Sequence, residues 1–210
     1  MFSYKQYLRK GSFKKDKNSS KIFIEKIKKF APKVFLEVGV FQGVTARNVC
    51  ELLSKIHQKK FKYIGIDLFI PSHENEVNSD FTPIHNRISN PFKNFYFNYI
   101  LKIDLTSHEG VSRFLNKFKN NIDLRKGSSN NVLKEINLKE VDFVFLDGGH
   151  SYEIVKNDLN ILLNNLNKSK IIICDDYNQK LYGVKKAVDE INKNKFKVSI
   201  LNDRLVEIIT

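Results

Sequence analysis

Three aspartates and one histidine stand where two apolar runs of the sequence end. Asp147 closes the first run and His150 follows it after two glycines, while Asp175 and Asp176 close the second run side by side. Adjacent carboxylates repel one another unless a proton or a cation compensates their charge, so a bound metal is the economical explanation for the pair. A neutral imidazole, with an unperturbed pKa of about 6.5, can accept a proton at neutral pH. These residue types predict chemistry that uses a hard cation and a general base.

Structural roles are the alternatives for the same residues. Asp147 as the cap of a following helix, and Asp175 and Asp176 as residues that hold loops, would need no metal. His150 as a residue that positions a substrate would take no proton. Whether these side chains can lie close together depends on the secondary-structure elements that carry them.

The two apolar runs have the length and composition of buried parallel strands. Val141–Leu146 precedes an amphipathic segment, Glu153–Leu166, and Lys170–Cys174 precedes a second segment with apolar residues at helical spacing. The carboxyl ends of parallel strands meet at one edge of a sheet, where ligands bind in such folds. We therefore expect the aspartates and the histidine at that edge.

An earlier strand leads into a glycine turn. Lys33–Val38 is a short apolar run, followed by the residues GVFQG and by a segment with helical spacing. Gly39 and Gly43 permit positive φ and the close approach of a ligand, and the next helix offers unpaired N–H groups at its N-terminus. The turn lacks the G-x-G-x-x-G spacing, and its acidic residue, Glu37, lies inside the strand. The pattern therefore disfavours a nicotinamide cofactor.

Two further strands end in polar groups suited to a nucleoside. Phe61–Ile66 ends at Asp67, and a carboxylate at the tip of a second strand can accept hydrogen bonds from both hydroxyls of a ribose. A solvated acid at a strand end is the alternative. Asn121–Lys126 ends in the loop GSSNN, whose hydroxyls and backbone suit the edge of a base.

The order of the predicted elements indicates the fold class. Strands that alternate with helices specify an α/β sheet with right-handed crossovers and helices on both faces. The final segment, residues 196–209, alternates around a turn at Asn202-Asp203 and predicts a terminal β-hairpin. We expect a mostly parallel sheet to which the hairpin adds antiparallel strands.

Several segments resemble class I S-adenosylmethionine-dependent methyltransferases. EVGVFQGVT resembles the first cofactor motif and YIGID the second, while FVFLDGGHSYEIVKNDL and IIICDDY resemble the fourth and fifth. Together with GVKKAVDEI they are most similar to the macrocin and mycinamicin sugar O-methyltransferases, and more distantly to catechol O-methyltransferase. The resemblance covers Val34–Ile191 and implies a Rossmann-like fold with a seven-stranded central sheet.

The resemblance also implies roles for individual residues. His150 occupies the position of a general base, and Mg²⁺ or another divalent cation would bind Asp147, Asp175 and Asp176. The cofactor S-adenosyl-L-methionine would lie against Glu37, Gly39, Phe41, Gly43, Thr45, Asp67, Ser128, Ser129 and Asp147.

Two parts of the chain fall outside the resemblance. We expect residues 1–32 to form a basic, solvated arm and a helix, with the first nineteen residues loose or in a short helix, and residues 33–210 to form the methyltransferase domain. Residues 69–104 contain three prolines, two histidines and an aromatic cluster. Their length predicts an insertion that covers the substrate, with an accessory helix as the alternative. His73 and His85, which lie there, receive no role.

Composition limits which partners and which cellular compartment the protein can have. The formal net charge of +13 suits nucleic acid, but the lysines are scattered through the helices and loops and are not interleaved with aromatics on one face. No apolar run approaches the roughly 20 residues of a membrane span. The N-terminal residues lack the apolar core of a signal peptide. We therefore expect a cytoplasmic protein without a membrane partner.

The leading hypothesis is a metal-dependent O-methyltransferase that acts on a small hydroxylated molecule such as a sugar. An RNA methyltransferase is one alternative, disfavoured because DGGH stands where base-methylating enzymes usually carry an acid or asparagine, two prolines and an aromatic. A non-catalytic cofactor-binding module is the other, and the aspartates with His150 argue against it. A homo-oligomer is compatible with each hypothesis.

Overall fold

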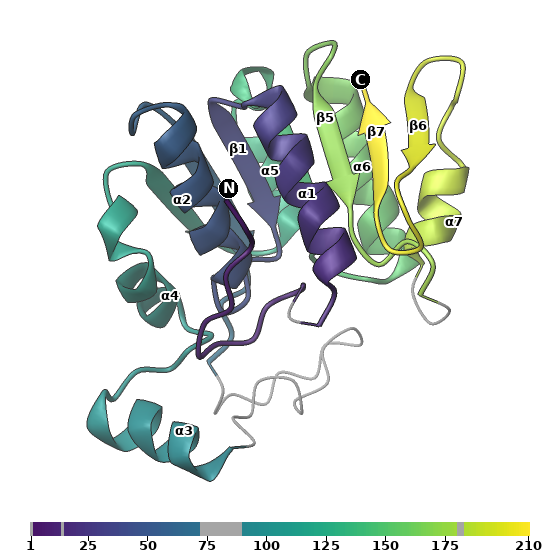
Figure 1. Ribbon diagram of the computed structural model, residues 1–210. Helices are drawn as coiled ribbons and strands as arrows, with labels where there is room; N and C mark the ends of the chain where they lie inside the picture. Colours follow the sequence, from purple (N-terminus) through teal and green to yellow (C-terminus); the bar gives the residue numbers. More distant parts are fainter. Residues whose placement is uncertain (1, 14, 72–89, 180–182) are drawn as a thin grey trace.

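Seven strands form one sheet: β1 (Val34–Val38), β2 (Lys62–Asp67), β3 (Ile122–Lys126), β4 (Phe143–Leu146), β5 (Ile171–Cys174), β6 (Lys197–Ile200) and β7 (Val206–Ile209). The computed structural model describes residues 2–13, 15–71, 90–179 and 183–210. The strand order is β3-β2-β1-β4-β5-β7-β6, with the first five strands parallel and the last two antiparallel to their neighbours (Figure 1). The predicted Rossmann-like α/β fold with a C-terminal antiparallel hairpin is confirmed.

Helices cover both faces of the sheet, as Figure 1 shows. One face carries α1 (Lys17–Phe30), α2 (Val44–Ile56) and α4 (His108–Phe114), and the other carries α5 (Ser129–Glu135), α6 (Tyr152–Asn165) and α7 (Val184–Asp189). Because both faces are covered, β4 and β5 are continuous apolar runs, and every residue in them is buried. None of the described helices is both long enough and apolar enough to cross a membrane.

Alternate residues of each strand serve two separate cores. Phe143 and Phe145 of β4 point to the face of α1 and α2, where they join Phe23 and Phe35. Val144 and the other alternate positions pack against α5, α6 and α7. This two-residue period is the geometry of a strand, and it fixes which side chains each helix layer contacts.

The strand register brings the ends of three parallel strands level with one another. Val38 of β1 pairs with Leu146 of β4, which in turn pairs with Cys174 of β5. The residues that come next therefore lie at one edge of the sheet. Asp147 and Asp175 both hold this position, and each donates its backbone N–H to the last carbonyl of the neighbouring strand, at 2.8 Å and 3.0 Å.

The N-terminal arm is packed, so the expectation of a loose, solvated segment is wrong. Phe13 is only 1% exposed, and its ring lies 5.2 Å from the ring of Phe23 and 5.8 Å from that of Phe145. Arg9 is 7% exposed. The arm runs along α2 and crosses to the start of α1 near the carboxyl ends of the strands (Figure 1). The aromatic side chains of the arm pack against the core, although its many lysines suggest a solvated segment.

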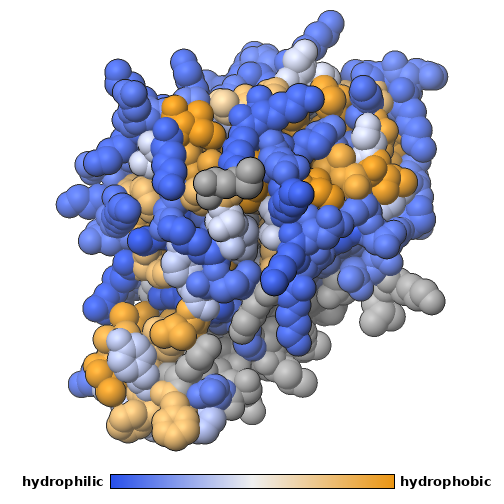
Figure 2. Space-filling view, in the orientation of Figure 1, coloured by the Kyte–Doolittle hydropathy of each residue, from blue (hydrophilic) through white to orange (hydrophobic). Residues whose placement is uncertain are grey.

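Part of the predicted insertion forms a short projecting helix. α3 (Pro91–Phe95) continues into a π-helical turn (Tyr96–Ile100) that stands away from the sheet (Figure 1). Phe92 is 85% exposed and Tyr99 is 69% exposed, and this region is apolar in Figure 2. The accessory-helix alternative therefore describes this part. Residues 72–89 of the insertion, which include His73 and His85, lie outside the described residues.

Candidate active site

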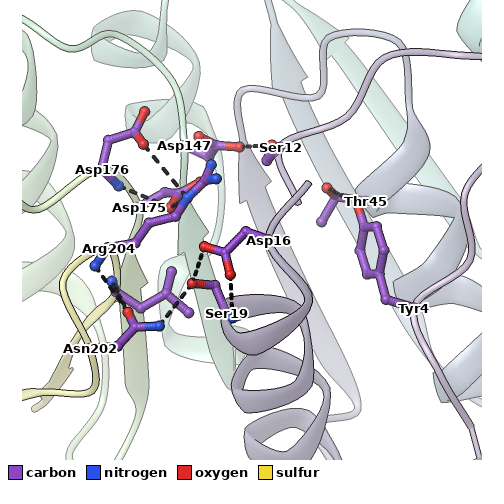
Figure 3. Close-up of polar contacts among 11 residues, drawn as sticks. Tyr4, Ser12, Asp16, Ser19, Thr45, Asp147, Asp175, Asp176, Asn202 and Arg204 are labelled. Carbon is purple, nitrogen blue, oxygen red and sulfur yellow. Dashed lines mark hydrogen bonds and ion pairs between the residues drawn. The ribbon is translucent and has the colours of Figure 1, made fainter. Parts of the chain in front are cut away.

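The three aspartates predicted from the sequence meet at the edge of the sheet. One carboxylate oxygen each from Asp147, Asp175 and Asp176 lie within 4.8 Å of one another. Asp147 follows β4 and the pair follows β5, and the register of these strands puts them side by side (Figure 3). Asp176 has a φ of +55°, a conformation that aspartate tolerates better than most residues and that is frequent at functional sites.

Arg204 binds this cluster, and the sequence did not point to it. Its Nε donates to Asp175 Oδ1 at 2.5 Å and its Nη2 to Asp175 Oδ2 at 2.6 Å. The Nε also lies 3.6 Å from Asp176 Oδ1. Arg204 stands in the turn between β6 and β7, and β7 is the neighbour of β5. Sheet order was the only signal that could have linked this arginine to the aspartates.

The charged forms of two carboxylates in the cluster are disfavoured despite the arginine. Burial raises the pKa of Asp147, and the charge of Asp175 raises it further, while a hydrogen bond from Ser12 opposes the shift. Burial and the charge of Asp175 also raise the pKa of Asp176 to about 6, against the effect of Arg204. A carboxylate whose charged form is disfavoured in this way is stabilised by a cation or by a proton.

The glycine turn after β1 packs directly on the end of β4. Gly39 has a φ of +93° and Gly43 a φ of +76°, so both use the freedom that the sequence suggested. A Cβ on Gly39 would lie 2.0 Å from the carbonyl oxygen of Asp147. The expected cofactor turn and the first aspartate are therefore in contact.

Asp67 anchors the same turn from the end of β2. Its Oδ2 accepts the backbone N–H of Phe41 at 2.8 Å, and its Oδ1 accepts that of Phe69 at 2.8 Å. The alternative of a merely solvated acid is excluded by these two contacts. Phe41 itself adopts a φ of +50° within the turn.

Two of the expected cofactor contacts are buried beneath the turn. Glu37 is 1% exposed and accepts a hydrogen bond from Tyr63 Oη at 2.6 Å. Burial raises its pKa to about 8, although the Tyr63 hydrogen bond opposes the shift. Thr45 is 3% exposed, and its hydroxyl shares a hydrogen bond with Tyr4 of the arm at 2.8 Å. Both side chains are therefore buried and bound within the protein, Glu37 to Tyr63 of β2 and Thr45 to Tyr4 of the arm.

The serine loop lies beside Asp67, as its place after β3 predicts. The backbone N–H of Gly127 donates to the carbonyl of Asp67 at 2.9 Å. Ser128 is exposed and precedes α5, which begins at Ser129. The two groups expected to take a ribose and a base are thus adjacent at one end of the site.

His150 lies in the loop between β4 and α6, three residues after Asp147. The residue is half-buried, and its backbone carbonyl accepts the N–H of Gly183 at 2.7 Å, which ties the loop to the start of α7. A Cβ on Gly183 would lie 2.2 Å from the backbone nitrogen of Tyr152, so the two segments are in close contact. The loop that carries His150 is therefore held on both sides.

A Rossmann-like sheet with its polar groups gathered at the carboxyl ends of β1, β2, β4 and β5 defines a class I methyltransferase architecture. The methyltransferase-domain family model matches residues 36–177, and the chain belongs to this family. The prediction of an S-adenosylmethionine-dependent methyltransferase is confirmed. No curated protein sequence matches the chain.

Solved structures of low sequence identity share the fold. CalS11, described as a TDP-rhamnose 3'-O-methyltransferase of calicheamicin biosynthesis, superposes with a TM-score of 0.60 at 15% identity, over 94% of this chain and 81% of that chain. The O-methyltransferase NovP gives 0.59 at 18% identity, over 89% and 78%. The methyltransferase PaMTH1 of Podospora anserina, solved with SAH bound, gives 0.59 at 14% identity, over 92% and 78%.

Proposed function

We propose that this methyltransferase transfers the methyl group of S-adenosyl-L-methionine to a hydroxyl of a small molecule, with sugars as the acceptor class. The contact between the glycine turn and the aspartate cluster carries the proposal. Gly39 lies against the carbonyl of Asp147, so a methyl donor held at the turn and an acceptor held at the cluster would be neighbours. Alignment of the two reactants is the main requirement of an in-line methyl transfer.

The residues at the turn suit the cofactor. The positive φ at Gly39 and Gly43 lets the turn pack where an added Cβ would meet the carbonyl of Asp147 and the side chain of Val111, respectively. The backbone N–H groups of Phe41 and Phe69 fix Asp67 at the end of β2, where a carboxylate would take the ribose, and the Ser128–Ser129 loop lies next to it. S-adenosyl-L-methionine would supply an electrophilic methyl group on a sulfonium.

The aspartates suit a divalent cation. Carboxylates are the hard oxygen donors that Mg²⁺ prefers, and three of them converge on one point. Burial, followed by the charge of Asp175, raises the pKa of Asp147 and of Asp176, so a cation bound between them would stabilise their charged forms. Asp147, Asp175 and Asp176 would hold the ion, which when bound lowers the pKa of a coordinated hydroxyl and fixes its position.

His150 would take the proton of the acceptor hydroxyl. A neutral imidazole is available for this at neutral pH, and a positioned general base contributes typically about 10² to 10⁴ in rate. Its loop begins at Asp147 and is tied to α7, so the histidine follows the first aspartate closely and in a fixed loop.

A sugar acceptor is supported by the neighbours and by the site chemistry. CalS11 and NovP are described as O-methyltransferases, and CalS11 as one that acts on TDP-rhamnose. A sugar offers vicinal hydroxyls that can bind a cation through two oxygens. The +13 charge would favour an acceptor that carries phosphate.

The test is a methyl-transfer assay with radiolabelled S-adenosyl-L-methionine and a panel of nucleotide sugars, free sugars and phenols, run with Mg²⁺ and with excess chelator. We expect transfer to a sugar hydroxyl, lost in chelator and in Asp175→Ala, while calorimetric binding of SAH is kept. Asp123→Asn, on β3 and paired with Arg125, is the matched carboxylate control. Full activity in chelator would refute the metal. Tight RNA binding with a steep salt dependence, without transfer to any sugar, would refute the acceptor class.

A further inference from the structure

Arg204 occupies the aspartate cluster with a cation that belongs to the chain itself. Its guanidinium makes two hydrogen bonds to Asp175, at 2.5 Å and 2.6 Å, in the side-by-side geometry of a bidentate pair. Asp175 is 1% exposed at its side chain, and Arg204 is 22% exposed. The pair is therefore largely shielded from water, and its hydrogen bonds are of the strong, charge-assisted kind.

The turn that carries Arg204 is rigidly held. Asn202 Oδ1 accepts the backbone N–H of Arg204 at 3.0 Å and that of Leu205 at 2.7 Å, and Asn202 Nδ2 donates to Ser19 Oγ at 2.8 Å (Figure 3). The carbonyl of Arg204 accepts the N–H of Tyr177, the residue after the aspartate pair, at 2.9 Å. The backbone of this turn is thus fixed directly against the segment that the guanidinium contacts.

The N-terminal arm completes the surroundings of the guanidinium. The centre of the Arg204 guanidinium lies 5.1 Å from the centroid of the Phe13 ring, which is within the range of a cation–π contact. The preceding residue of the arm, Ser12, donates its hydroxyl to Asp147. Arm and hairpin turn therefore both supply donors to the aspartates that a cation would use.

Arg204 and a metal ion require the same electron pairs. Asp175 Oδ1 already accepts from Arg204 Nε and from the backbone N–H of Asp176, which fills its two lone pairs. Asp175 Oδ2 accepts from Arg204 Nη2 and has one pair left. Asp175 can thus offer little to a divalent cation while both contacts with Arg204 persist. When ionised, three carboxylates and one guanidinium leave a charge of about −2, which still attracts such an ion.

We propose that Arg204 is a built-in competitor for the divalent cation, so that metal binding at the three aspartates requires at least one of its contacts with Asp175 to be released. The proposal rests on the proposed metal site. In the cation-free protein the guanidinium holds the cluster together, and it makes the site weak and reversible for metal. Arg204 is thus a residue that sets metal affinity, distinct from the ligands themselves.

The test is a titration of the full chain with Mn²⁺, in which electron paramagnetic resonance measures the concentration of free ion. SAH affinity is measured by calorimetry on the same samples. We expect Arg204→Met to bind Mn²⁺ at least about tenfold more tightly than the unchanged protein, which corresponds to about 1.4 kcal/mol. Arg204→Lys keeps a positive charge without the bidentate contact and should fall between the two. Lys26→Met is the matched control, because Lys26 pairs with Glu207 of the same hairpin at 2.7 Å, and its Mn²⁺ affinity should not change.

The direction in which Mn²⁺ affinity changes distinguishes competition between Arg204 and the metal from structural damage to the site. A merely structural role predicts weaker Mn²⁺ binding in Arg204→Met, and equal or weaker binding in both arginine variants overturns the proposal. If Arg204→Met does not fold, Arg204→Lys decides by the same criterion. SAH binding without Mn²⁺ binding in any variant overturns the competitor and the metal site together, and leaves the methyltransferase assignment standing. If the unchanged protein does not bind SAH, the result counts instead against the proposed cofactor site.

Discussion

Gly39 lies so close to Asp147 that no side chain fits between them. A Cβ at Gly39 would lie 2.0 Å from the carbonyl oxygen of Asp147, and the φ of +93° at Gly39 is one that other residues rarely adopt. The turn after β1 and the strand end that carries the first aspartate are thus packed as one unit. A change at either residue should disturb both halves of the proposed site.

Gly39→Ala should therefore destabilise the fold and weaken SAH binding together. The strained φ alone costs of order 1–3 kcal/mol, and the contact with a backbone carbonyl adds to this because backbone atoms cannot easily move away. Urea denaturation measures the free energy of unfolding, and calorimetry measures SAH affinity.

Gly148→Ala is the matched control for this substitution. An added Cβ there would meet Val38 Cγ1 at 3.0 Å, which is a side-chain atom and can shift by a few tenths of an ångström. It should lose less stability than Gly39→Ala. Unchanged SAH affinity in a folded Gly39→Ala protein would place the cofactor elsewhere.

The sequence predicted the strands and the aspartates well because both depend on local patterns. Short apolar runs buried on both faces identify parallel strands, and the order of strands and helices then places the residues after each strand at one edge. Asp147, Asp175 and Asp176 meet for this reason. The α/β class follows from the alternation of strands and helices, whereas the set of three aspartates came from the resemblance to class I methyltransferases.

Arg204 and the arm were not predictable in the same way. Arg204 reaches Asp175 because β7 lies beside β5. The two residues are 29 positions apart in the sequence, and no local pattern encodes a contact over that separation. The arm lacks periodicity, so Phe13 gave no sign that it would be buried, and the arm's lysines suggested a solvated segment. Long-range packing decides such positions, and it leaves little trace in a single sequence.

Glu37→Gln should flatten the dependence of stability on pH. Burial raises the pKa of Glu37 to about 8 in the folded protein, against an ordinary value of about 4.3 in an unfolded chain. The folded state therefore holds a proton that the unfolded state releases. The stabilisation is fully present below the unfolded pKa and is lost as pH rises through the folded pKa, over about pH 4 to 8.

Glutamine resembles the neutral acid, so the variant should lose less stability than the unchanged protein between about pH 5 and pH 8. Urea denaturation at several pH values measures this difference, and comparison of the two proteins removes the contribution of other titrating groups. Parallel stability curves would mean that Glu37 keeps its charge in the folded state. The variant should also retain the hydrogen bond from Tyr63, since the amide oxygen can accept it.

Arg9→Met should detach the arm from the body of the protein. The Arg9 guanidinium donates to the carbonyls of Gln42 and Leu105 at 3.2 Å each and to that of Gly110 at 3.1 Å. Removal of these charge-assisted bonds leaves buried carbonyls without that partner, at a cost of about 2–3 kcal/mol. Because Gln42 belongs to the glycine turn, SAH affinity should fall as well.

Limited proteolysis can follow the release of the arm, and denaturation the loss of stability. Lys15→Met is the control, since Lys15 is an exposed cation at the end of the arm, and its removal should change the free energy of unfolding by no more than about 0.5 kcal/mol and should not release the arm. If the arm of Arg9→Met stays as resistant to protease as that of the unchanged protein, Phe13 rather than Arg9 anchors it.

His150→Gln should lower kcat by about 10² to 10⁴ while SAH affinity stays nearly the same, because a general base acts on the proton in transit and not on the bound cofactor. The acid limb of the pH profile of kcat, where the unchanged imidazole becomes protonated, should disappear with it. Stopped assays with the acceptor found in the sugar panel measure both quantities. His57→Gln is the matched control, because the His57 ring bonds to the carbonyls of Ala31 and Pro32 beyond the C-terminus of α2, at the opposite end from the glycine turn. If His150→Gln keeps the acid limb and most of kcat, the histidine only positions the acceptor, and the proton leaves by another route.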